Sequence, residues 1–271
     1  MEAVATEQPA SPSPASWTTS TVLGRALDEL GGVAQMGGRA LSLILRGRIG
    51  WQALVEQIET IGLASVSITA LTAIFSSMVM AVQFAAQMGR FGAKEWVGSI
   101  VSLSLVRELG PTLTALMVGG RVGSGIAAEL GSMNVTEQVD ALRSMGADPL
   151  EVLVVPRVLA AVLVLPLLTA LCDALGVTGA MVITRLTANI NMSYFFNAML
   201  RSVEVEDMAG GLVKTIFFGL IIGLVACYQG LTAANGTEGV GRATTRTVVI
   251  ASITVLISDF VLTNILLGFG L

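Results

Sequence analysis

The longest uninterrupted apolar segment, residues 61–88, constrains this chain most. Its 28 residues contain no charged side chain. As an α-helix rising 1.5 Å per residue it would be about 42 Å long, which exceeds the hydrocarbon core of a bilayer, about 30 Å thick. The segment therefore predicts a helix that spans a membrane.

Four further apolar segments follow the first, and the composition agrees with several spans. Hydrophobic residues make up 54% of the chain and charged residues 13%, whereas soluble domains carry about 25% charge. We predict an all-α integral membrane protein with one domain, residues 21–271. Its five predicted spans are 61–88, 96–128, 153–187, 208–230 and 247–270.

The N-terminal region divides into two predicted parts. Residues 1–20 are rich in Pro, Ser, Thr and Ala, and we predict a disordered polar tail. Residues 22–50 alternate apolar side chains with charges such as Arg25, Asp28 and Glu29. Each charge at the centre of a span would cost about 2.5–3.5 kcal/mol, so a helix lying in the membrane interface fits better than a span.

A polar stretch, residues 129–156, separates the second predicted span from the third. Asn134 is a suitable N-cap and Glu137 stands at N3, which predicts a capping box. Gly146 is placed to end the helix, and the following Asp-Pro pair prevents it from resuming. Together with one apolar stripe, this predicts a short amphipathic helix on the membrane surface. The stripe consists of Val135, Val139 and Leu142.

Several classes of function are disfavoured by composition. The net charge is −4 and no basic run exists, so nucleic acid is not an expected partner. Histidine is absent, and Cys172 and Cys227 lie in apolar segments without a CxxC motif. Neither lysine, Lys94 or Lys214, follows a phosphate-binding glycine loop. We therefore expect no metal site, no cofactor in this chain and no ATP hydrolysis by it.

Basic residues predict the orientation in the membrane. With five spans, the N-terminus, the polar stretch and a Gly- and Thr-rich turn at 231–246 share one side, which carries nine arginines. The other side carries five basic residues, Lys214 among them. The first side is predicted to be cytoplasmic, so the C-terminus faces outward.

Arg107 and Glu108 fall near the middle of the second predicted span. Adjacent residues on a helix point about 100° apart, so each requires its own partner. Two interpretations stay open. The pair lines a cavity for an amphiphile, with Arg107 on an anionic head group, or it belongs to a network that joins helices.

Two other polar features inside spans also have two interpretations each. Asp173 and Asp259 are suited to a proton relay or to helix packing, and the absence of histidine favours packing. The glycine pairs 119/123 and 219/223 allow close helix approach, either within one chain or at a dimer seam.

Two long motifs resemble the MlaE-type permease family, also called YrbE. They are LVRELGPTLTALMVGGRVGSGIAAELGSMNVTEQVDALRSMGADPLEVLVVPR and GRATTRTVVIASITVLISDFVLT. Members are membrane subunits of ABC systems that move phospholipids with MCE proteins. The resemblance extends from about residue 22 to the C-terminus.

This resemblance implies a homodimer in the bacterial inner membrane, with the N-terminus cytoplasmic and the C-terminus periplasmic. It implies an Mla-type ATPase that supplies ATP and Mg²⁺ chemistry, a periplasmic MCE protein, and in some systems a STAS-domain subunit. Phospholipid would pass between the inner membrane and the MCE protein, maintaining outer-membrane lipid asymmetry.

The resemblance also implies roles for particular residues. The polar stretch becomes the ATPase-coupling helix, and a lipid pocket at the dimer centre is lined by the first and second spans. The implied pocket residues are Arg107, Glu108, Met80, Gln87 and Phe91. The implied coupling residues are Asn134, Glu137, Val139, Asp140, Leu142, Arg143 and Gly146.

Two alternatives to an ATP-driven permease remain. A proton-coupled carrier would use Glu108, Asp173 and Asp259, and would transport without an ATPase. A membrane anchor would only hold an MCE ring, and substitution of Arg107 and Glu108 would then leave lipid movement unchanged.

Overall fold

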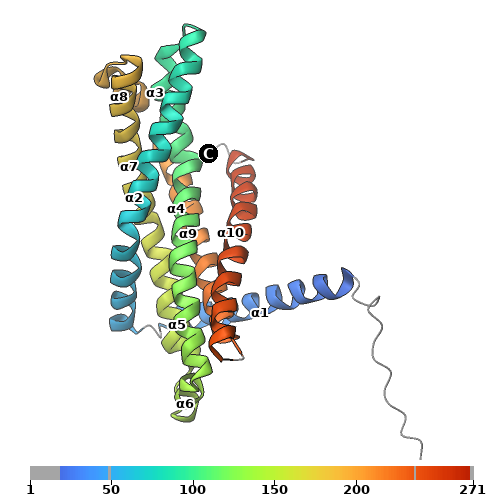
Figure 1. The fold of residues 1–271 in the computed structure, drawn as a ribbon. Coiled ribbons are helices and arrows are strands. Elements are labelled where there is room, and N and C mark those ends of the chain that lie inside the picture. The colour runs from blue at the N-terminus through green and yellow to red at the C-terminus, as the bar shows by residue number, and fades with distance from the viewer. Residues whose placement is uncertain (1–18, 48–49, 235, 269–271) are drawn as a thin grey trace, which may run out of the picture.

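The described part of the chain forms an elongated helical bundle (Figure 1). The structure is a computed structural model, and it describes residues 19–47, 50–234 and 236–268. Most of the tail predicted at 1–20 lies outside the described residues. The elements are α1 (Thr19–Leu45), α2 (Trp51–Arg90), η2 (Lys94–Trp96), α3 (Val97–Ser104), η3 (Leu105–Leu109), α4 (Gly110–Val118), η4 (Gly119–Gly123), α5 (Ser124–Val135), α6 (Gln138–Ser144), η5 (Leu150–Val154), α7 (Val155–Ala188), α8 (Met192–Ser202), α9 (Val205–Leu231) and α10 (Gly236–Gly268).

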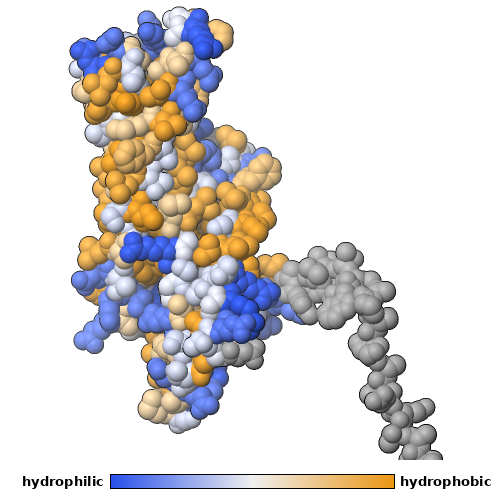
Figure 2. Space-filling view, in the orientation of Figure 1, coloured by the Kyte–Doolittle hydropathy of each residue, from blue (hydrophilic) through white to orange (hydrophobic). Residues whose placement is uncertain are grey.

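Five helical segments in the described residues are long and apolar enough to cross a membrane, as predicted. The second runs from Lys94 to Val135 as one near-continuous rod that includes the turns η3 and η4. Figure 2 shows apolar side chains around the middle of the bundle and polar ones at both ends. The helices exceed their predicted spans because the backbone stays helical beyond the apolar core.

The most extensive helix contact in the described residues is between α2 and α7, which run side by side along their length. Every fourth residue of α2 turns a mostly small side chain to this contact. Because these side chains are small, the two backbones approach closely, which suits a membrane interior where dispersion contacts and packing hold helices together. The buried positions are Ile61, Ser65, Thr69, Ala73, Ser77, Ala81 and Ala85.

Glycines bring α9 close to its neighbours inside the bundle. A Cβ at Gly219 would lie 2.7 Å from the carbonyl oxygen of Ala161 on α7, and one at Gly223 would lie 3.1 Å from Val158 Cα. A Cβ at Gly119 would lie 3.3 Å from Ile222, also on α9. The glycine pairs of the sequence therefore serve packing within one chain.

Helix α1 runs across one end of the bundle, transverse to the spans (Figure 1). Glu29 forms an ion pair with Arg246 of α10 at 2.6 Å, and Gly32 lies directly against the Tyr228 ring of α9. The helix is Thr19–Leu45, shifted from the predicted 22–50. Its transverse course suits an interfacial helix, and its position in a bilayer stays a prediction.

The predicted start of the surface helix is wrong. Helix α5 continues to Val135, so Asn134 is a helical residue and its Nδ2 donates to the carbonyl oxygen of Ala233, at 3.0 Å. Glu137 adopts a left-handed conformation, with φ of 62°, and makes no side-chain cap. A capping box requires a chain that enters the helix from extended backbone. Here α5 leads into α6 through a short turn in which Glu137 is left-handed.

The predicted end of the same helix agrees with the structure. Gly146 has a φ of 80°, its N–H donates to Arg143 O at 3.0 Å, and Ala147 N–H donates to Leu142 O at 3.1 Å. These two bonds form a Schellman motif. Val139 is buried and Leu142 packs against the core, whereas the Asp140–Arg143 ion pair, at 2.7 Å, is exposed.

The connections on the two sides of α9 differ from each other. Between α7 and α9 the chain forms the short helix α8. The turn predicted at 231–246 is wrong in most of its length, because α10 already begins at Gly236. Chain reversal is concentrated around Gly236, whose φ is 69°, and the glycines and threonines that follow form helix.

Candidate functional site

A proline inside the second span removes one backbone hydrogen bond at the site. Residues Leu105–Leu109 form a π-helical turn, and Pro111 follows within α4. Proline has no N–H, so the carbonyl oxygen of Arg107, four residues earlier, loses its usual helical donor. Lys214 Nζ of α9 donates to that oxygen at 3.2 Å. Membrane helices with proline need such a replacement donor.

Lys214 is the centre of a polar cluster that joins three helices. Its side chain is only 3% exposed and forms an ion pair with Glu108 Oε1 at 2.9 Å. It also donates to Thr263 Oγ1 of α10 at 2.7 Å, and Asp259 Oδ1 of α10 lies 3.5 Å away. Thr112 Oγ1 donates to Asp259 Oδ2 at 2.9 Å. A buried charge is tolerated when it is paired and hydrogen-bonded in this way.

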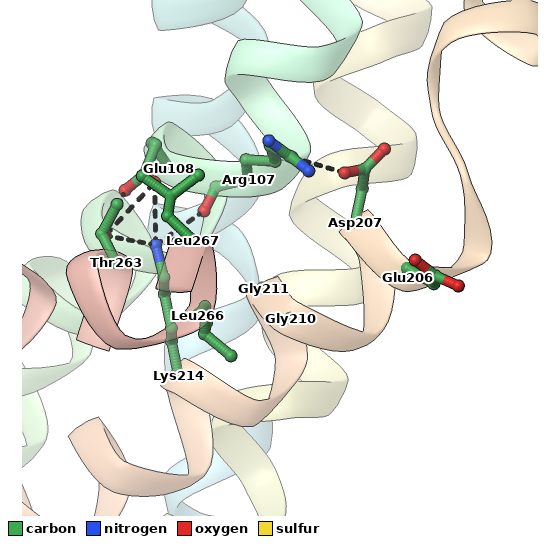
Figure 3. A pocket seen from close by; sticks show the side chains of 10 residues that line it. All are labelled: Arg107, Glu108, Glu206, Asp207, Gly210, Gly211, Lys214, Thr263, Leu266 and Leu267. Carbon is green, nitrogen blue, oxygen red and sulfur yellow. Dashed lines mark hydrogen bonds and ion pairs between the residues drawn. The ribbon is translucent and has the colours of Figure 1, made fainter. Parts of the chain in front are cut away.

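Arg107 has a separate partner, as the helix geometry predicts. Its Nε forms an ion pair with Oδ1 of Asp207, at the start of α9. The other oxygen of Asp207 accepts the Glu204 N–H at 2.8 Å, which completes a capping box at the N-terminus of α9. Figure 3 shows Arg107 and Glu108 directed to different partners on either side of the π-helical turn.

A small hollow lies beside this cluster. Arg107, Glu108, Asp207 and Lys214 all line it, and its volume is about 30 Å³, which is room for a water molecule or two. The side chains of Arg107 and Glu108 are 37% and 41% exposed. Both interpretations made from the sequence thus have a counterpart here, a network joining helices and an opening toward the outside of the chain.

The other residues implied for the lipid pocket lie elsewhere on this chain. Met80, Gln87 and Phe91 belong to α2 or its end and do not line the hollow. Met80 is partly buried against the cluster around Phe195, Gln87 is exposed, and Phe91 is 80% exposed. Within one chain the structure does not bring them to Arg107 and Glu108.

The remaining acidic residues of the spans have packing contacts. Asp173 of α7 is buried, and its Oδ1 occupies the space that a Cβ on Gly110 would fill. Asp259 and Glu108 share Lys214. Two of the three carboxylates considered for a proton relay are therefore engaged by one lysine, and Cys172 and Cys227 are buried free thiols.

Sequence reasoning missed the partners of the central pair. The predicted fourth span starts at 208 and leaves Asp207 out, and Lys214 was counted as an outward-facing charge, whereas both are buried side chains of α9. Their spacing contained a signal. Asp207, Gly211 and Lys214 are four and three residues apart, and Asp259 and Thr263 are four apart, so each set shares one helix face.

Comparisons with known proteins agree on one family. The family described as Permease MlaE matches residues 54–265. A probable ABC transporter permease protein of Rickettsia typhi is 41% identical over 227 residues, 84% of this chain and 88% of that one. A probable ABC transporter permease protein of Synechocystis is 42% identical over 225 residues, 83% of this chain and 86% of that one.

A plant relative is also similar over most of its length. The chloroplastic protein TRIGALACTOSYLDIACYLGLYCEROL 1 of Arabidopsis thaliana is 35% identical over 248 residues, 92% of this chain and 70% of that protein. The family match covers well over half of the chain, and it includes all five membrane-spanning segments in whole or in large part. The chain is therefore a multi-pass membrane protein that belongs to the MlaE permease family.

Proposed function

We propose that this chain is the membrane subunit of an ABC system that moves phospholipids, with ATP hydrolysed by a partner ATPase. The bacterial relatives are named as probable ABC transporter permeases, and the name of the plant relative contains that of a glycerolipid. Neither lysine of this chain stands in a phosphate-binding loop, so the energy for transport comes from another subunit.

The observation that carries this proposal is the construction of α6. It is a seven-residue helix between the second and third spans, held at its end by the Schellman motif. One face, with Val139 and Leu142, packs on the bundle, and the other presents the exposed Asp140, Arg143 and Met145. A short helix fixed to the spans on one face and open on the other is suited to receive a push from a partner.

The lipid site proposed here requires a second copy of the chain. A hollow of about 30 Å³ cannot accommodate a phospholipid head group. Helices α2 and α10 expose long apolar faces, including Phe75 and Phe260. In a homodimer such faces would meet, and α2 would bring Met80, Gln87 and Phe91 to a shared cavity with Arg107 and Glu108. The guanidinium would bind a lipid phosphate.

The partners and location proposed follow the family. An Mla-type ATPase contacts α6 through Asn134–Gly146 on the cytoplasmic side, an MCE protein receives the lipid on the periplasmic side, and a STAS-domain subunit is a further candidate. The chain lies in a bacterial inner membrane with its C-terminus periplasmic. The physiological result is outer-membrane lipid asymmetry. Closure of the ATPase would move α6, and the spans joined to α6 would change the shape of the lipid cavity.

Substitution of Leu142 tests this function. In proteoliposomes that contain the full complex, Leu142→Asp should lower ATP-dependent lipid transfer about tenfold, because the loss of a partly buried leucine costs about 1.5 kcal/mol of helix docking. Thr245→Asp, at an exposed position of α10 outside the proposed ATPase contact, is the matched control. Transfer by Leu142→Asp at the normal rate, with the protein correctly inserted, would contradict the coupling role.

Two further measurements separate the alternative functions. Arg107→Ala combined with Glu108→Gln should abolish lipid transfer in the assembled complex, whereas unchanged transfer would favour a passive anchor. The purified chain without an ATPase should show no transfer under a pH gradient, whereas transfer there would favour a proton-coupled carrier.

A further inference from the structure

A buried arginine lies where the chain returns from α6 into the membrane. Arg157, at the start of α7, is only 5% exposed. Its Nη2 forms an ion pair with Glu129 Oε1 of α5 at 2.8 Å. Its Nη1 donates to the carbonyl oxygen of Leu153 at 2.8 Å, within the π-helical turn η5. One guanidinium therefore contacts the helix before α6 and the turn after it.

The two helices joined by this contact pack mainly on other parts of the bundle. Helix α5 packs on α9 and α10, where a Cβ at Gly131 would lie 3.4 Å from Val240. Helix α7 packs on α2 and α9, and α5 and α7 make few close contacts with each other. The ion pair between Glu129 and Arg157 thus joins the two ends of the segment that contains α6.

Geometry makes this link stiff. A guanidinium is planar and donates in fixed directions, so two bonds from one group set the orientation of both acceptors. Because Arg157 is buried, its bonds do not compete with bulk water. Glu129 is 55% exposed, so replacing its carboxylate with an amide of the same shape removes the ion pair while a polar group still faces Arg157. These are the properties of a joint, a rigid contact that holds α5 and α7 in a fixed relation, and they differ from those of a substrate site.

We propose that the Glu129–Arg157 pair is the joint that makes α5 and α7 move together when α6 is pushed. Both are positioning residues, which act through the helices and do not touch the lipid. The inference rests on the proposed ATP-driven function for its consequence in transport. The mechanical part, that the pair restrains α6 and η5, stands on the contacts alone and can be measured separately.

Amide hydrogen exchange tests the mechanical part on the full chain in nanodiscs. Glu129→Gln should raise exchange of the amides in 138–154 by about threefold or more, because local opening becomes easier. Glu238→Gln is the matched control, since it also removes a glutamate that pairs with an arginine, Arg242 at 3.0 Å, but at an exposed site within one turn of α10. Exchange in 138–154 equal to that of the unsubstituted chain would overturn the joint.

Transport measurements test the consequence. In the assembled complex, Glu129→Gln should keep most of the ATPase rate and move fewer lipids per ATP, whereas Glu238→Gln should change neither. An unchanged ratio of lipid to ATP would overturn the proposed role of the pair. If the unsubstituted complex itself moved no lipid with ATP, the proposed function would fail, and the exchange experiment would still decide the joint.

A second variant tests the same contact if the first variant fails to fold or insert. If Glu129→Gln inserts poorly, Arg157→Lys retains the charge and removes the forked geometry. It should give the same faster exchange and the same lower ratio, and a Lys variant indistinguishable from the parent in both would contradict the joint.

Discussion

At the scale of single residues, the charges around Arg107 and Glu108 are paired across three helices. Arg107 pairs with Asp207, and Lys214 pairs with Glu108 and Asp259. Lys214 also supplies the hydrogen bond that Pro111 takes from the backbone. Each of these charged groups would be costly alone in hydrocarbon and has a partner here, whereas the buried Oδ1 of Asp173 has no hydrogen-bond partner among the described residues. Removing one member leaves the others uncompensated, which gives the first prediction.

Lys214→Met should destabilise the protein by about 3 kcal/mol. Removal of one partner of a buried ion pair costs about 3–5 kcal/mol, and the partial exposure of Glu108 places this case at the lower end. Thermal unfolding in detergent measures the change. Lys94→Met removes the only other lysine of the chain, at an exposed position, and should change stability little. Equal effects of the two substitutions would contradict the role of Lys214.

Gly110→Ala should destabilise the protein by about 1–3 kcal/mol, the usual cost of overpacking. The new methyl group would overlap Asp173 Oδ1. Asp173→Ala in the same chain should recover part of the loss, because it removes the overlapping oxygen. A double-mutant cycle of unfolding midpoints checks this, and strictly additive effects would count against the contact.

At the scale of elements, hydrophobic pattern predicts helices better than helix ends. The five spans follow from apolar length. The end of α6 at Gly146 follows from the place of this glycine after the last residue of the apolar stripe. The capping box at Asn134 failed because α5 stays helical through Asn134 to Val135. The π-helical turns were not predicted, because they depend on neighbours such as Gly211, where a Cβ would lie 2.5 Å from Val106 O.

Gly219→Ala should be destabilising by about 1–3 kcal/mol, because its Cβ would lie 2.7 Å from the Ala161 carbonyl oxygen and α9 would have to move off α7. Gly241→Ala, in α10, meets nothing within 4 Å and should be neutral or stabilising by up to about 1 kcal/mol. Unfolding midpoints of the two variants distinguish packing from helix propensity. Similar shifts in both variants would mean that α9 can move away from α7 at little cost in stability.

At the scale of the whole molecule, five spans predict that the two ends of the chain lie on opposite sides of the membrane. Helix α6 lies at one end of the bundle, and α8 lies at the other (Figure 1). The arginine distribution predicts that the α6 end is cytoplasmic. Lys214 and Arg157 are both buried, and without them eight basic residues stay on the predicted cytoplasmic side and four on the other.

Cysteine labelling tests this orientation. Ser144→Cys on α6 and Asn197→Cys on α8 both introduce exposed thiols, whereas the two native cysteines are buried. A membrane-impermeant maleimide should label position 197 in intact spheroplasts and position 144 only after permeabilisation. The reverse pattern would invert the orientation and remove α6 as a cytoplasmic contact.

The sequence by itself determined the class of fold and the presence of a surface helix, because apolar length and turn residues act locally along the chain. It also indicated that Arg107 and Glu108 have separate partners, since helix geometry alone requires it. Only the tertiary structure decided who those partners are. Asp207, Lys214 and Asp259 lie about 100 to 150 positions along the chain from Arg107 and Glu108, and only the packing of α9 and α10 against the π-helical turn brings them together.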